Sequence, residues 1–141
     1  MATVHFYEKP GCVNNHRQKQ LLQTAGHTLI VHNLLEHPWA ENRAKLRAFF
    51  GELPVADWFN RSAPTIKNSS INPELLTERQ AIELMIQDPL LIRRPLLEVD
   101  GRRRAGFELE RIDAWLGLPA ELPSSDLETC PKSSSEQSCQ P

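Results

Sequence analysis

The sequence predicts an α/β fold in which a mixed four-stranded sheet is flanked by helices. A β-loop-α-β unit fills residues 3–33. Two further strand patterns, at 96–99 and 102–107, are joined by Asp100-Gly101, a pair typical of hairpin turns. Between these regions, apolar residues recur at helical spacing. Together these features predict two parallel strands, a hairpin and helices that cover the sheet.

The N-terminal unit is the clearest of these elements. Residues 3–7 alternate β-branched and aromatic residues with polar ones, as a short strand does. A turn containing Pro10 and Gly11 leads to a predicted helix at 13–25, which Gly26 ends, and to a second strand at 28–33. A unit of this length is typical of a right-handed crossover between parallel strands.

The middle and the end of the chain are predicted to be mostly helical. One helix is expected at 39–50 and another at 78–87, where Thr77 is the predicted N-cap. The polar stretch 60–73 is expected to be a loop. A closing helix is predicted at 108–116. The three tryptophans are expected to pack in the core or to be half-buried.

The composition changes after Gly117. Residues 119–141 hold four Pro and six Ser and have a net charge of −3, so we expect a disordered tail there and a single domain at 1–118. The whole chain carries a net charge of −2, which does not favour nucleic-acid binding. No apolar run is long enough to span a membrane, and no secretory signal is visible. We therefore expect a cytoplasmic protein.

Cysteine usage points to one position. None of the three cysteines has C-x-x-C spacing, so neither a zinc ribbon nor a local dithiol is expected. Cys12 follows a strand and a Pro-Gly turn, and it precedes a helix. Unsatisfied backbone N–H groups and the helix dipole at such a position favour a thiolate, and the amides of residues 13–15 can also hold an oxyanion. The alternative interpretation is a structural cysteine.

Four segments in the same order resemble the arsenate reductase/Spx family, whose fold is thioredoxin-like with an inserted helical subdomain. They are YEKPGC at 7–12 leading to RQK at 17–19, WFNR at 58–61, DPLLIRRPL at 88–96, and DG at 100–101 with AGF at 105–107. The resemblance covers residues 3–118. It implies that Cys12 is the catalytic thiol and that Arg94–Pro95 is a cis peptide bond facing the cysteine loop.

The resemblance also implies an anion site beside Cys12. Arg61 and Arg94 match family arginines, whose planar fork suits arsenate or the carboxylates of glutathione. Asn14, Asn15 and Arg17 complete the expected substrate-binding set. Neither a metal nor a bound cofactor is expected, and glutathione or glutaredoxin would act as an external reductant.

A narrower resemblance links the chain to the nitrogenase-associated branch of this family. Two functions remain open at this point. One is a thiol-dependent oxidoreductase that uses glutathione or glutaredoxin, in which Cys130 and Cys139 are dispensable. The other is a non-catalytic regulatory or interaction protein linked to nitrogen fixation, with a nitrogen-fixation protein as its partner. The second is favoured by departures from the reductases, which carry arginine where this chain has His16 and Ala105.

Overall fold

The computed structural model describes residues 2–119, so the predicted tail at 119–141 falls outside the described residues apart from its first member. The four strands are β1 (Thr3–Glu8), β2 (Thr28–Asn33), β3 (Leu96–Val99) and β4 (Arg102–Ala105), arranged in the order β2-β1-β3-β4. β1 is parallel to β2 and antiparallel to β3, and β3 is antiparallel to β4. The predicted mixed sheet is confirmed.

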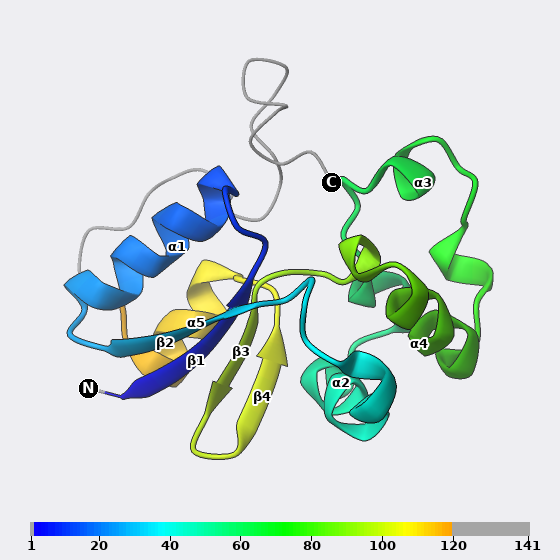
Figure 1. The fold of residues 1–141 in the computed structure, drawn as a ribbon. Coiled ribbons are helices and arrows are strands. Elements are labelled where there is room, and N and C mark those ends of the chain that lie inside the picture. The colour runs from blue at the N-terminus through cyan, green and yellow to red at the C-terminus, as the bar shows by residue number, and fades with distance from the viewer. Residues whose placement is uncertain (1, 120–141) are drawn as a thin grey trace.

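One face of the sheet is covered by α1 (Val13–Thr24) and α5 (Leu109–Leu116). Val4 and Phe6 point to this face because alternate residues of a strand share a side. They pack in one cluster with Leu22 of α1 and Ile112 of α5. This side of the molecule holds the helix that follows the cysteine loop (Figure 1).

The other face is covered by the segment inserted between β2 and β3. It contains α2 (Arg43–Phe50), α3 (Pro64–Lys67) and α4 (Glu78–Gln87), which lie together on the side away from α1 (Figure 1). Short 3₁₀ turns connect them at Trp39–Glu41, Val55–Trp58, Pro73–Leu75 and Pro89–Leu91. The core under these helices joins Tyr7 of β1 to Trp39, Phe49 and Trp58.

Two predictions about the insert were wrong. The helix expected at 39–50 is split, because Asn42 adopts a non-helical backbone and its side-chain Nδ2 donates to the Pro38 carbonyl at 2.9 Å. The stretch 60–73, expected to be a loop, contains α3, which begins with Pro64 at its first turn, a position that suits proline.

The last strand is shorter than predicted. β4 ends at Ala105 instead of residue 107, because Gly106 has a φ of +88° and turns the chain away from the sheet. The predicted Thr77 cap is confirmed: the Thr77 hydroxyl accepts from the Gln80 amide at 3.1 Å. Among residues 2–119, no helix combines the length and apolar character needed to cross a bilayer.

Candidate functional site around Cys12

Cys12 lies where the loop after β1 becomes α1. Gly11, with a φ of +84°, turns the chain, and the Cys12 amide donates to the Lys9 carbonyl at 3.1 Å. Cys12 then serves as the N-cap residue of α1 with an extended backbone, and its carbonyl accepts from His16 at 3.0 Å. The residue is reduced and 5% exposed. The thiol therefore lies at the first turn of a twelve-residue helix and is largely shielded from solvent.

Buried amide side chains fix the first turns of α1. Asn14, Asn15 and Gln18 are each at most 2% exposed. Asn15 Oδ1 accepts from the Lys9 amide at 3.1 Å, and Asn15 Nδ2 donates to Gln18 Oε1 at 2.8 Å. Asn15 thereby joins the loop before Cys12 to the helix after it. Buried polar groups bonded in this way hold one geometry, which makes Asn15 a positioning residue for the loop.

Arg94–Pro95 lies at the same end of the sheet. Tyr7 of β1 is the register partner of Leu96 in β3, so Pro95 falls beside Glu8, the last residue of β1 before the cysteine loop. The Arg94–Pro95 peptide bond is cis, as the resemblance implies, and the Pro95 carbonyl accepts from Gly106 at 2.8 Å. Arg94 is 7% exposed. The fold therefore brings the Arg94–Pro95 pair to the end of β1 from which the cysteine loop starts.

Arg61 is held differently. Its segment pairs with the chain before Arg94, through a bridge between Phe59 and Ile92. Its own side chain is 61% exposed, donates to the Ala56 carbonyl at 3.2 Å and lies 3.6 Å from the Asp57 carboxylate. The described contacts of Arg61 are thus made to its own turn.

The remaining predicted residue on α1 faces outward. Arg17 is exposed, as is its neighbour His16. On the same helix, Lys19 forms an ion pair with Glu8 at 2.7 Å, which ties α1 to the end of β1. The structure therefore buries Asn14, Asn15 and Arg94 with Cys12 and leaves Arg17 and Arg61 at the surface.

Two residues that organise this end of the sheet were missed from the sequence. Gln18 is fully buried. A polar side chain does not belong to the pattern of apolar residues that predicts the buried face of α1. Arg93 Nη1 donates to the Asp57 carbonyl at 3.1 Å, and its Nη2 lies 3.6 Å from the Glu108 carboxylate just before α5. Arg93 joins the insert to the closing helix. The position of Arg93 next to Arg94 in the 88–96 segment is the sequence feature that could have pointed to this role.

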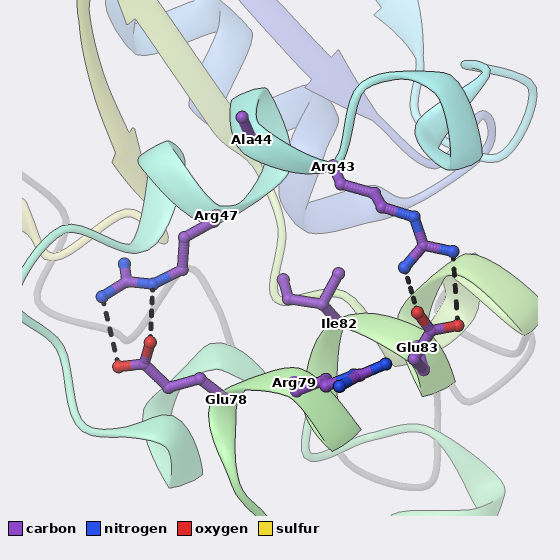
Figure 2. A pocket seen from close by; sticks show the side chains of 7 residues that line it. All are labelled: Arg43, Ala44, Arg47, Glu78, Arg79, Ile82 and Glu83. Atoms are coloured by element: carbon purple, nitrogen blue, oxygen red, sulfur yellow. Dashed lines mark hydrogen bonds and ion pairs between the residues drawn. The ribbon is translucent and has the colours of Figure 1, made fainter.

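A separate groove of about 620 Å³ lies between α2 and α4. Ile82 and Ala44 contribute its apolar surface (Figure 2). Two ion pairs cross between the helices, one from Arg43 to Glu83 and one from Arg47 to Glu78 at 3.2 Å. These pairs connect the two main helices of the insert.

The ArsC family model matches residues 7–115, which include the cysteine loop, the insert and the 88–96 segment. The chain belongs to the ArsC family. A protein of Rhodospirillum rubrum, described as an uncharacterized 15.7 kDa protein in the draG 3' region, is 45% identical over 139 residues, which cover 99% of this chain and 95% of the relative.

More distant members include a transcriptional regulator and a reductase. The global transcriptional regulator Spx 1 of Lactococcus lactis is 22% identical over 113 residues, covering 80% of this chain and 88% of the regulator. Among solved structures, the arsenate reductase of Vibrio cholerae superposes with a TM-score of 0.64 at 24% identity, covering 79% of this chain and 95% of that one. The thioredoxin-like fold with its helical insert is confirmed by these similarities.

Proposed function

We propose that the protein is a thiol-dependent oxidoreductase of the arsenate reductase type, in which Cys12 is the nucleophile. The observation that carries the proposal is the position of Cys12 as the N-cap residue of α1, where Asn15 anchors the preceding loop. Backbone amides and the helix dipole at that position can hold the oxyanion that the Cys12 sulfur would attack.

The proposed reduction of arsenate has three steps. The Cys12 thiolate attacks arsenic of arsenate, an S–As bond forms and water leaves. A glutathione thiol then attacks the Cys12 sulfur; an S–S bond forms, and the S–As electron pair stays on arsenic, which is released as arsenite. A second thiol, from glutathione or glutaredoxin, attacks the glutathione sulfur of the mixed disulfide and regenerates Cys12.

External thiols are assigned to the last two steps because Cys12 has Asn15 where a C-x-x-C pair would place its second cysteine. Arg94 is the proposed oxyanion ligand, since its guanidinium is bidentate and permanently charged. The buried Asn14 is proposed to contact the substrate from the first turn of α1, and the exposed Arg17 and Arg61 from the rim of the site. Glutathione or a small oxyanion is the proposed ligand, and the cytoplasm is the proposed location.

The test is arsenite production from arsenate with glutathione and glutaredoxin as reductants. Cys12→Ser should abolish turnover, whereas the Cys130→Ser/Cys139→Ser double variant should retain it. Arg94→Lys, which keeps the charge and loses the fork, should raise the KM for arsenate more than the matched change Arg111→Lys at an exposed position of α5. Unchanged turnover in Cys12→Ser would rule out the proposal.

The second candidate is a non-catalytic regulatory protein linked to nitrogen fixation. It is favoured by the draG-region relative, which matches almost the whole chain, and by the similarity to a transcriptional regulator. In this case the surface around Cys12 binds a nitrogen-fixation protein. Wild-type protein that fails to reduce arsenate, and that recovers the same partner as Cys12→Ser from nitrogen-fixing cells, would favour this candidate over the first.

A further inference from the structure

Two histidines from different strands meet on the face of the sheet that the insert covers. His5 of β1 and His32 of β2 lie with Nδ1 of His5 2.9 Å from Nε2 of His32. Their ring centroids are 5.2 Å apart and the ring planes differ by 18°. The two rings therefore face each other nitrogen to nitrogen at hydrogen-bond distance, so one ring donates and the other accepts.

Aromatic neighbours hold His32 in place. Its ring stacks on Tyr7 with centroids 4.5 Å apart, and Tyr7, which is 1% exposed, contacts His37 edge-on at 5.4 Å. The His37 ring packs in turn on Trp39 at 4.3 Å. His5 and His32 are themselves only partly buried. The His32 ring thus packs on an aromatic ring on its protein side, and the pair is reachable from solvent.

The charges around the pair have both signs. Glu98 of β3 is the register partner of His5, so its side chain emerges on the same face, where Arg103 Nη2 lies 2.9 Å from its Oε2. From α2, Lys45 lies over the Tyr7 ring, with Nζ 5.3 Å from the centroid. Burial, followed by His5 and Lys45, lowers the pKa of His32, while Glu98 opposes the shift.

We propose that His5 and His32 together bind a divalent transition-metal ion of the imidazole-preferring class, such as Ni²⁺, Cu²⁺ or Zn²⁺. When two imidazole nitrogens bind the same metal ion at about 2.1 Å with a nitrogen–metal–nitrogen angle of about 90°, the nitrogens are about 3 Å apart. This is close to the 2.9 Å between the facing nitrogens of His5 and His32. A rotation of the rings directs both lone pairs to one point, and torsions of this kind are soft in histidine.

Metal binding replaces the hydrogen bond between the two rings by two bonds to the metal. The histidine that donates in the pair moves its proton to its other ring nitrogen, which is Nε2 in His5 or Nδ1 in His32, and both facing nitrogens then coordinate the metal. Glu98 lowers the cost of placing a dication at this point, and Lys45 raises it. The site therefore has two ligands, one nearby carboxylate, Glu98, which Arg103 partly neutralises, and one nearby ammonium, Lys45.

The test uses Ni²⁺ and the full chain in two measurements. In a ¹⁵N-labelled sample, substoichiometric Ni²⁺ should first broaden the amide signals near His5 and His32. Calorimetric titration with NiCl₂ should show that His5→Gln and His32→Gln each weaken one binding event by about ten-fold or more, since even outer-shell losses at metal sites cost that much. The exposed His16→Gln should leave this event unchanged.

Two further variants separate coordination from a general loss of structure. Glu98→Gln should weaken Ni²⁺ binding and Lys45→Gln should strengthen it, each by a smaller factor than loss of a histidine. Broadening that centres on Cys12 or His16, or affinity that is unchanged in both His5→Gln and His32→Gln, would overturn the proposal. A preserved amide spectrum of His32→Gln would show that this variant is folded, so that its Ni²⁺ affinity can be compared with that of the unmodified chain.

Discussion

The two faces of the sheet are packed by different chemistry. The face toward the insert buries large rings, among them Trp58 and Phe50, which stack with centroids 4.8 Å apart. The face toward α1 and α5 has one smaller cluster of mainly aliphatic residues with Phe6 and Phe107, and its helix α1 buries three polar amides, Asn14, Asn15 and Gln18. The insert side has apolar area suited to stability, whereas the α1 side has hydrogen bonds suited to positioning.

This division separates what holds the fold from what holds the site. Apolar burial is non-directional and scales with area, so the insert can stabilise the sheet without fixing any one atom. Hydrogen bonds between buried amides specify direction, so the α1 side fixes the loop that carries Cys12. Variants on the two sides should therefore differ in kind, the first changing stability and the second changing reactivity.

The largest effect is expected at Trp58. Its side chain is fully buried, stacks on Phe50 and donates from Nε1 to the Leu53 carbonyl at 2.8 Å. Trp58→Ala should lower the free energy of unfolding by about 3–5 kcal/mol in chemical denaturation. The control is Trp115→Ala on α5, whose side chain is only partly buried and whose loss should cost less. Equal losses would remove the proposed difference between the two faces.

Asn15 is expected to give the next largest effect. Asn15→Ala removes the hydrogen bonds that Asn15 makes with the Lys9 amide and the Gln18 side chain, which should cost about 1–3 kcal/mol. It should also slow alkylation of Cys12 in the folded protein, because the loop before Cys12 is released. The exposed His16→Ala should change neither quantity. Lost stability with unchanged Cys12 alkylation would show that Asn15 supports the fold and not the site.

A pH dependence of stability is expected from the histidines on the insert face. Burial lowers the pKa of His32, assisted by His5 and Lys45, and lowers the pKa of His37, assisted by Lys45 and His32. The unfolded chain then binds more protons than the folded chain below about pH 6.5, so stability falls as the pH drops through that value. Denaturation between pH 8 and pH 5 measures this slope. His37→Gln should flatten it, and a slope unaffected by that change would contradict the assignment.

The smallest effect is expected from the surface ion pairs between α2 and α4. Glu78 and Arg47 are both well exposed, at 58% and 37% for their side chains. Glu78→Gln should therefore cost less than about 1 kcal/mol, and less again in high salt. Thermal melts at low and high salt test this. A loss as large as that of Trp58→Ala would mean that the insert depends on charge and not on its aromatic core.

Sequence patterns predicted the sheet better than the insert. Strand alternation, the Pro-Gly turn and the Asp100-Gly101 hairpin are local signals, and each appears where it was expected. The insert also contains short elements, such as the 3₁₀ turn between Pro38 and Asn42 and the four-residue helix that begins at Pro64, whose geometry depends on tertiary packing. The helical spacing of apolar residues across 39–50 therefore predicted one helix, whereas Asn42 separates two elements there.

The site was predicted in part for the same reason. Cys12 and the Arg94–Pro95 bond belong to contiguous motifs, and the strand register then brings them to one end of the sheet. Gln18 and the His5–His32 pair were not found, because their roles arise from contacts between elements. His5 and His32 are 27 positions apart, and only the parallel pairing of β1 with β2 brings their rings together.

The most direct test of the Cys12 site is the rate of its alkylation in the folded and in the urea-unfolded chain at neutral pH. Brief exposure to iodoacetamide, followed by peptide mass spectrometry, reports each cysteine separately, with Cys130 and Cys139 as references in the same chain. We expect Cys12 to react faster in the folded protein than in the unfolded one, because the proposed nucleophile depends on its place at the first turn of the folded α1. A Cys12 that reacts more slowly when folded would be a buried structural cysteine, and the proposed chemistry would be wrong.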